Sequence, residues 1–399
     1  MPEPKVRFKR DDGSSYPSWA STRLNNLFQR VNERNNGQFD NTKWISVAKM
    51  YYQDPDKVQS NNIDTRTYVM RYGDIAFEGH PNDDFMYGRF VMNDIGDGVI
   101  SELFPIYRFR EDYVLKYWKY AIQVERVMAP VYRKAITTSG ASSNKLNEDD
   151  FLRESIHVPC LEEQQKIADF LSSVDAVITA SEEEVANLET QKKAVIKKIF
   201  SQEVRFKRDD GSDFPEWVST HLSDLFQRVN ERNNGQFDNT KWISVAKMYY
   251  QDPDKVQSNN IDTRTYVMRY GDIAFEGHPN ADFMYGRFVV NDIGDGVISE
   301  LFPIYRHKKD YVLKYWKHAI QVEMIMAPIY RKAITSSGAS SNKLNEEDFL
   351  RESIPVPSLE EQRLIADFLS DFDEAIAAAK KELELWKELK KGLLQQMFV

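Results

Sequence analysis

The sequence predicts an α+β fold in which two globular α/β domains are joined by two long, antiparallel, coiled-coil-like helices with pseudo-two-fold symmetry. Three observations predict this fold. Most of the chain repeats, with an offset of 198 residues that separates Val6 from Val204. Each copy ends in a long stretch with the apolar spacing of a helix. Each copy begins with short apolar runs separated by turn-forming residues, which is typical of strands and loops.

The repeat sets the domain organisation. Residues Leu27–Asn82 match Leu225–Asn280 without a difference, while the changes scatter elsewhere and are most frequent in the helical stretches. A period this long predicts two copies of a whole domain rather than a solenoid. We therefore expect a first globular domain over residues 1–158, a first long helix over 159–202, a second globular domain over 203–356 and a second long helix over 357–399.

The helical stretches carry apolar residues at alternating steps of four and three over about five heptads, which predicts a long helix with one apolar seam. At 1.5 Å per residue each helix would be roughly 55–60 Å long, too long for the core of one such domain. We expect the two seams to pack on each other. The seam residues are Ile167, Leu171, Val174, Ile178, Val185, Leu188, Val195 and Ile199 in the first copy, and Ile365, Leu369, Phe372, Ile376, Ala379, Leu383, Trp386, Leu393 and Met397 in the second.

The two helices are expected to start and end with different strength. Ser358 precedes Glu361 by three residues, a spacing that predicts a capping box. The first copy has Cys160 at the cap position, so its helix should start less stably by about 1 kcal/mol. Gly392 weakens the last turns of the second helix by about 1 kcal/mol, so these turns should fray unless they dock on something.

Lys192 and Lys390 occupy equivalent positions on the two helices, beside the seam. One interpretation is that their stems lie along the seam while the ammonium groups reach water. The other is that they fix the register of the helices or face a partner, as polar seam residues can. The sequence leaves both interpretations open.

Each globular domain should mix strands, turns and short helices. In the first copy we expect a strand or short helix within Trp19–Asn32 and a turn-rich connection from Asn93 to Gly98. Asn147 is a plausible cap for a short helix that runs through Leu152. We expect strands at Trp44–Ala48, Tyr68–Met70, Tyr72–Phe77 (after a turn), Arg89–Met92 and Gly98–Ser101, and one continuous helix over Asp112–Ala129.

Composition excludes several classes of protein. The 399 residues contain one cysteine, which argues against a disulfide framework and suits the reducing cytoplasm. The sequence has no apolar run of the roughly 18–20 residues that a membrane helix needs, and no signal-peptide pattern at its start. The formal net charge of −9 argues against a nucleic-acid binder coated in positive charge, but it leaves room for local basic patches.

The sequence lacks the patterns of the common catalytic sites. No cluster of cysteine and histidine has metal-ligand spacing, and no glycine-rich phosphate loop or nucleophile elbow is present. The run Asp54-Pro55-Asp56-Lys57 resembles a nuclease motif only faintly, and a proline-containing turn explains it better. We expect no catalysis, no metal and no cofactor of its own from this chain.

Polar, aromatic and basic side chains interleave on the expected loops, as DNA recognition requires: arginine and lysine grip phosphates or guanine, and asparagine reads adenine. A solvated polar surface is the plain alternative. The candidate DNA-binding residues are Lys49, Tyr51, Tyr52, Arg66, Tyr68, His80, Asn82, Tyr87, Arg89, Arg133, Lys134, Ser142, Ser143, Asn144 and Lys145 in the first copy, and Lys247, Tyr249, Tyr250, Arg264, Tyr266, His278, Asn280, Tyr285, Arg287, Arg331, Lys332, Ser340, Ser341, Asn342 and Lys343 in the second.

The order of these features resembles a known family. A variable domain is followed by a Ser/Gly-rich loop, a short helix, an Ile-Pro-Val-Pro-x-Leu-Glu-Glu-Gln motif and an Ile-Ala-Asp-Phe-Leu start of a long helix. The motif stands at Ile354–Gln362, and at Ile156–Gln164 with His157 and Cys160 as departures. Over nearly the whole chain, and twice in tandem, this resembles the DNA-specificity (S) subunit of Type I restriction–modification systems.

The resemblance implies partners and a mechanism. The globular domains would be target-recognition domains on double-stranded DNA, and the helices an antiparallel spacer. Two methyltransferase (M) subunits, which hold S-adenosylmethionine, would dock on the assembly, and restriction (R) subunits with nuclease and translocase activity can join. The exposed helix faces at Glu182–Glu184 and Lys192–Lys193 are the expected partner surface, with a solvated face as the alternative.

The near-identity of the two copies adds a further expectation. Equivalent readers related by a two-fold axis read an inverted repeat, so we expect an interrupted palindrome as the target. Asp83 in the first copy is Ala281 in the second, and Phe109–Glu111 corresponds to the more basic His307–Lys309. Two other classes of function stay open from the sequence: a coiled-coil scaffold without a DNA role, and a DNA binder that never meets a methyltransferase.

Overall fold

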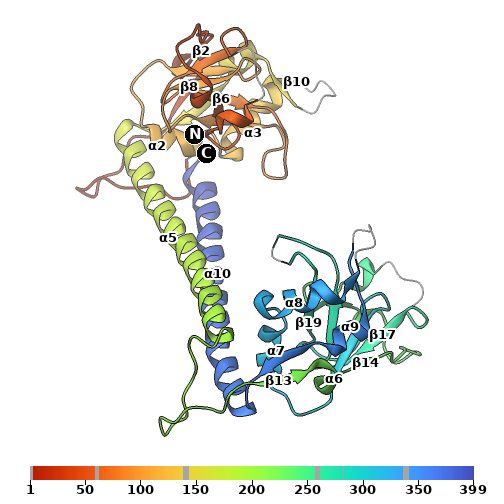
Figure 1. The fold of residues 1–399 in the computed structure, drawn as a ribbon. Helices are drawn as coiled ribbons and strands as arrows, with labels where there is room; N and C mark the ends of the chain where they lie inside the picture. The colour runs from red at the N-terminus through yellow and green to blue at the C-terminus, as the bar shows by residue number, and fades with distance from the viewer. Residues whose placement is uncertain (1–2, 59–62, 138–142, 257–260, 282, 336–340) are drawn as a thin grey trace. The chain divides into compact units, whose positions relative to one another are not determined.

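The computed structural model describes residues 3–58, 63–137, 143–256, 261–281, 283–335 and 341–399. It divides into two compact units, the first made of Met1–Glu182 with Lys381–Val399 and the second of Glu183–Lys380. Each unit holds one globular domain and a part of both long helices (Figure 1). Among the described residues, no helix combines the length and the apolar character needed to cross a membrane.

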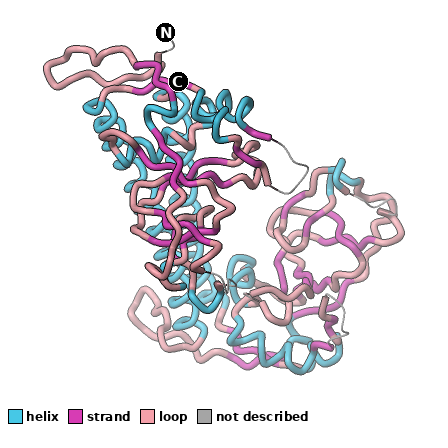
Figure 2. Tube along the Cα trace, turned by 90° about the horizontal axis from the view of Figure 1, so that it is seen from above, coloured by secondary structure: helices cyan, strands magenta, loops and turns pink. Residues whose placement is uncertain are grey.

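The first unit is built on short antiparallel strands joined by long loops, drawn in pink in Figure 2. Its largest sheet has four strands in the order β2-β9-β6-β7, and four two-stranded ladders pair β1 with β12, β3 with β4, β5 with β8 and β10 with β11. The strands are β1 (Ala20–Arg23), β2 (Phe28–Val31), β3 (Ile45–Ser46), β4 (Tyr51–Tyr52), β5 (Thr67–Met70), β6 (Ile75–Glu78), β7 (Arg89–Met92), β8 (Gly98–Ser101), β9 (Ile106–Phe109), β10 (Ile136–Thr137), β11 (Lys145–Leu146) and β12 (Ser155–Val158).

The short helices of the first unit correct one prediction. The continuous helix expected over Asp112–Ala129 is wrong, because the chain leaves the helical conformation at Val124. Both sides of this break are apolar and buried, so one straight helix could not have buried all of them on a single face. The helices are α1 (Leu24–Leu27), α2 (Leu115–Ala121), α3 (Glu125–Ala135), α4 (Glu148–Arg153), η1 (Asn41–Lys43) and η2 (Pro55–Lys57).

Other local predictions fared unevenly. The strands expected near Tyr68–Met70, Arg89–Met92 and Gly98–Ser101 are confirmed, and Asn147 caps α4 by accepting the backbone N–H of Asp150 at 3.2 Å. The strand expected over Trp44–Ala48 is present only as the two residues of β3, because the chain then turns and pairs with β3 as β4. Strands β9 and β12, which close the sheets, were not predicted.

The first unit has two apolar cores. The larger one joins Trp19, Phe28, Phe90 and Trp118 with the helices α2, α3 and α4. The smaller one lies around Ile45 between β3, β5, β6, β7, β8 and β9. The two cores therefore use opposite faces of the same strands, since Ile75 and Phe77 face the larger core and Ala76 faces the smaller.

The second unit repeats this architecture with the four-stranded order β14-β21-β18-β19. Its strands are β13 (Val218–His221), β14 (Phe226–Val229), β15 (Ile243–Ser244), β16 (Tyr249–Tyr250), β17 (Thr265–Met268), β18 (Ile273–Glu276), β19 (Arg287–Val290), β20 (Gly296–Ser299), β21 (Ile304–His307), β22 (Ile334–Thr335), β23 (Lys343–Leu344) and β24 (Ser353–Val356). Its helices are α6 (Leu222–Leu225), α7 (Leu313–Ala319), α8 (Glu323–Ala333), α9 (Glu346–Arg351), η3 (Asn239–Lys241) and η4 (Pro253–Lys255).

The long helices are α5 (Leu161–Phe200) and α10 (Leu359–Met397), and within each unit they run antiparallel. In the first unit Lys390 Nζ lies 2.6 Å from Asp175 Oδ1, and Lys387 Nζ lies 3.0 Å from Glu182 Oε1. In the second unit Lys192 makes the ion pair with Asp373 that corresponds to Lys390 with Asp175. Both lysines thus have interhelical carboxylate partners, which favours the register interpretation over a free snorkelling lysine.

The end of each long helix completes a globular core. Met397 and Phe398 are buried in the larger core of the first unit, and Phe398 packs edge-on against Trp19 with ring centroids 6.4 Å apart. In the second unit Phe200 packs in the same way on Trp217 at 6.0 Å. The turns after Gly392 therefore dock rather than fray. The seams, which were expected to pack on each other, are shared between the partner helix and these cores.

The start of each long helix is held by a buried carboxylate. Glu163 has no exposed surface, and it accepts hydrogen bonds from Arg7 Nη2 at 2.8 Å and from Trp19 Nε1 at 3.1 Å. Glu361 repeats both contacts with Arg205 and Trp217. The predicted capping box is therefore only half made: Ser358 Oγ accepts the Glu361 N–H at 3.3 Å, but the glutamate side chain is used elsewhere.

Candidate nucleic-acid interface

Two loops that the sequence singled out separately meet in the first unit. The loop from His80 to Gly88 connects β6 to β7, and the other loop leads into β11. The backbone N–H of Asn144 donates to Gly79 O at 2.8 Å, and Asn144 Nδ2 donates to Met86 O at 3.4 Å. A side chain on Gly79 would collide with Asn144 O at 2.1 Å, so the close approach requires glycine.

Arg89 connects this pair of loops to a third predicted region. Its Nη2 donates to Ala48 O, beside the exposed Lys49, and its guanidinium lies 4.8 Å from the ring centre of Phe85. Its Nε is buried and has no hydrogen-bond partner among the described residues. The loops around Lys49, His80 and Asn144 thus form one surface, which we call the reading surface.

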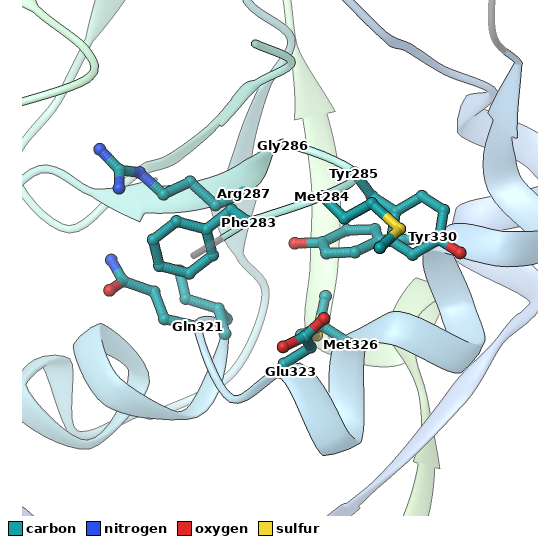
Figure 3. A pocket seen from close by; sticks show the side chains of 10 residues that line it. Phe283, Met284, Tyr285, Gly286, Arg287, Gln321, Glu323, Met326 and Tyr330 are labelled. Carbon is teal, nitrogen blue, oxygen red and sulfur yellow. The ribbon is translucent and has the colours of Figure 1, made fainter. Parts of the chain in front are cut away.

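Figure 3 shows the same region in the second unit, at the foot of the loop that ends in β19. Phe283, Tyr285 and Arg287 line a shallow hollow on one side, and Glu323 and Tyr330 of α8 line the other. The phenol oxygen of Tyr330 accepts the backbone N–H of Phe288 at 3.3 Å, and burial raises the pKa of Tyr330. The start of β19 is therefore held by a hydrogen bond to the buried Tyr330.

The predicted residues divide by exposure. Lys49, Tyr51, His80, Asn82, Arg133 and Lys145 are exposed, with their second-copy counterparts Lys247, Tyr249, His278, Asn280, Arg331 and Lys343. These side chains can reach a ligand without rearrangement. Arg66 is also exposed, but its Nε lies 3.4 Å from Glu102, its neighbour at the same end of the β5–β8 ladder. The equivalent Arg264 has the same contact with Glu300.

Other predicted residues have contact partners within their own domain. The Tyr52 hydroxyl donates to Asp97 O at 3.0 Å, and the Tyr68 ring lies 4.5 Å from the Arg34 guanidinium. Tyr87 packs on Tyr132. Lys134 Nζ lies 2.7 Å from Glu154 Oε2. The counterparts Tyr250, Tyr266, Tyr285 and Lys332 make the same contacts.

The remaining predictions concern the small-polar loop. Ser142 and Ser340 lie outside the described residues. Ser143 and Asn144 are half-buried against Gly79, as are Ser341 and Asn342 against Gly277. Whether any of these residues contacts DNA stays a prediction.

One residue of this region was missed in the sequence. Glu78, the last residue of β6, is 5% exposed and contacts the His80 ring and backbone. A glutamate two residues before a histidine at a strand end was the available signal. No group of three potential metal ligands occurs among the described residues.

Several known proteins are similar to this chain in sequence or fold. A family model described as the Type I restriction modification DNA specificity domain matches residues 121–190 and 298–385. The Type I restriction enzyme MjaVIII specificity subunit of Methanocaldococcus jannaschii is 24% identical over 279 residues, and the match covers 64% of this chain and 64% of that protein. The chain thus spans about two thirds of the length of this relative.

Two solved structures share the fold. One belongs to work on complex assembly and conformational transition of the type I R-M system; it has a TM-score of 0.60 at 16% identity and covers 96% of this chain and 98% of its own. The other is the S subunit of the Type-I restriction-modification system from M. genitalium, with a TM-score of 0.53 at 12% identity over 100% and 99% of the two chains. With its two repeated domains and long helices, the chain is similar to the DNA specificity subunits of Type I restriction–modification systems.

Proposed function

We propose that this chain is the sequence-reading subunit of a Type I restriction–modification complex and that it reads an interrupted palindrome in double-stranded DNA. Each globular domain reads one half-site with its reading surface, and the long helices set the spacing. The chain itself catalyses nothing. It works in the cytoplasm, where the DNA and the partner subunits are.

One observation supports the palindrome: the two reading surfaces are nearly identical in chemistry, with Asp83 against Ala281 as a difference. Residues Leu27–Asn82 equal Leu225–Asn280, and the supporting contacts recur. Arg89 with Ala48 corresponds to Arg287 with Ala246, and Asn144 with Gly79 corresponds to Asn342 with Gly277. Equal readers select equal half-sites, and a two-fold relation between them would invert one half-site relative to the other.

The partners supply the chemistry. Two methyltransferase subunits, carrying S-adenosylmethionine, would dock on the complex, and each would take an adenine out of the duplex stack. Restriction subunits can join the same assembly. Phosphate contacts from the exposed lysines and arginines would provide salt-dependent affinity, and base contacts would provide sequence choice. Because the chain carries a net charge of −9, we expect it to bind DNA weakly when it is alone.

Co-expression of the chain with its methyltransferase partner, followed by mapping of methylated adenines on genomic DNA, tests the proposal. The expected result is an interrupted palindrome with one methylated adenine in each half, on opposite strands. An asymmetric motif with unrelated half-sites would overturn the equivalence of the two readers. Absence of methylation with an active partner would overturn the proposed function.

A further inference from the structure

A buried carboxylate stands directly behind the reading surface in both units. Glu78 is 5% exposed and Glu276 is 4% exposed, which is rare for glutamate. A buried carboxylate needs hydrogen-bond partners to offset its lost hydration. Glu78 has them in one residue: its Oε1 accepts the backbone N–H of His80 at 2.9 Å and also contacts His80 Nδ1. Glu276 makes the same two contacts with His278.

This arrangement fixes the imidazole. A carboxylate only accepts hydrogen bonds, so the ring of His80 carries a hydrogen on Nδ1 and its other nitrogen, Nε2, is left for an outside partner. The side chain of His80 is 59% exposed, whereas that of Glu78 is 6% exposed. The polar end of the ring that Glu78 does not hold is therefore the part available to a ligand.

The backbone around the pair is equally constrained. Gly88 has a φ of +82°, and a side chain there would lie 2.5 Å from Glu78 O. Asn82 Oδ1 accepts the backbone N–H groups of Asp84 and Phe85, both at 3.0 Å, which holds the turn after His80. A phosphate contact does not require a loop held in this way, because a flexible lysine can bind a phosphate. A hydrogen bond to a base edge does require a side chain with fixed geometry.

We propose that His80 and His278 each read one base pair of a half-site through Nε2, and that Glu78 and Glu276 are the positioning residues that set ring orientation and tautomer. The inference rests on the proposed function and deepens it. When the ring is neutral and carries its hydrogen on Nδ1, Nε2 is a hydrogen-bond acceptor. The matching donors in the major groove are the amino groups of adenine and cytosine.

The test uses the complete methyltransferase complex and a library of DNA targets varied at each position of its motif. His80→Ala, with His278 intact, should reduce discrimination at one base pair of one half-site by about tenfold. His278→Ala is the matched control and should relax the corresponding base pair of the other half-site. Because His80 is exposed and the backbone N–H of residue 80 still binds Glu78 in the variant, its replacement should leave folding intact.

Glu78→Gln tests the positioning role. It keeps size and polarity but can present an amide N–H to the ring, so it should relax the same base pair as His80→Ala, and the double variant should be no worse than His80→Ala alone. An equal loss of affinity for every sequence, or an unchanged motif, would overturn the inference. If Glu78→Gln prevents folding, His80→Ala still decides it. A wild-type complex without any sequence preference would instead overturn the proposed function.

Discussion

The two units share their reading surfaces but differ in the residues that join each domain to the helices. In the first unit the Tyr120 hydroxyl donates to Asp175 Oδ2 at 2.7 Å, and Asp175 is also bound by Lys390. In the second unit His318 takes the place of Tyr120, with its Nε2 at 3.5 Å from Asp373, the partner of Lys192.

A second difference lies in the sheet. Phe109 stacks on Tyr113 with centroids 4.0 Å apart, and His307 stacks on Tyr311 at 3.9 Å in the same pose. The imidazole fills the shape of the phenyl ring, but its Nε2 is buried without a hydrogen-bond partner among the described residues. The comparison teaches that the surface expected to read DNA is nearly the same in both units, while the residues that join each domain to the helices differ in polarity.

The largest effect is expected when the buried glutamate that both units have at the start of a long helix is removed. Glu163→Ala leaves Arg7 and Trp19 without their buried acceptor, so the first unit should lose about 3–5 kcal/mol of unfolding free energy. Glu361→Ala should affect the second unit equally. Hydrogen exchange of peptides from each unit measures this. The control is Glu162→Ala: this side chain is 68% exposed, and losing its pair with Arg10 should cost less than about 1 kcal/mol. Equal effects of the two variants would contradict the anchoring role.

The next prediction uses acid to separate the units. Burial lowers the pKa of His307 to about 3 and that of His318 to about 4. Between these values and the ordinary pKa of about 6.5, the unfolded chain binds protons that the folded unit does not, so stability falls as pH falls. Each histidine should cost the second unit at most about 2 kcal/mol at pH 5.

The first unit lacks both histidines and should keep more of its stability between pH 7 and pH 5. Hydrogen exchange at the two pH values compares the units in one sample. His307→Phe, which copies the first unit, should remove part of the acid sensitivity of the second. An acid response that is the same in both units would show that buried histidines do not cause it.

A smaller effect is expected at the helix starts. Cys160→Ser copies Ser358, whose Oγ accepts a backbone N–H at the start of α10. We expect the first unit to gain about 1 kcal/mol, visible as a higher thermal midpoint. Ser358→Cys is the reverse control and should destabilise the second unit by a similar amount. A gain without the matching loss would point to a cause other than capping.

The smallest effect is expected at a position where the two reading surfaces differ in charge. Asp83 is exposed beside His80, where the second copy has Ala281. Asp83→Ala removes a carboxylate from a surface expected to meet phosphates, so DNA affinity of the complex should rise by about 0.2–1 kcal/mol. Ala281→Asp should lower affinity by the same amount, and both effects should shrink in high salt. A change of the same sign in both variants would contradict an electrostatic origin.

The sequence predicted what depends on period and spacing. The duplication, both long helices and the cap at Asn147 follow from local patterns that the structure retains. The break at Val124 did not follow, because it depends on burying two apolar faces at once. Tyr52 and Tyr68 show a similar limit of sequence-based prediction. Both were predicted to contact DNA because they flank loops, but in the structure they contact Asp97 and Arg34 of the same domain.

The contacts between loops that are far apart in the chain could not be predicted from the sequence either. Nothing in a local pattern indicates that Asn144 reaches Gly79, or that Glu78 is buried behind His80, because both depend on how β6, β7 and β11 come together. The missed strands β9 and β12 have the same cause: each is defined by its partner, β2 or β1, far away in the chain.

The docking of Met397 and Phe398 into the first unit has a consequence for synthesis. Residues 183–380 form the second unit as one continuous segment, whereas the first unit needs residues 381–399 to complete its core. On the ribosome, domains usually fold in the order in which they emerge. In this chain the first domain to emerge is the last to be completed, because Trp19 lacks its contact with Phe398 until the end of the chain is made. We therefore expect part of the larger apolar core of the first unit to stay exposed until those last helical turns are made.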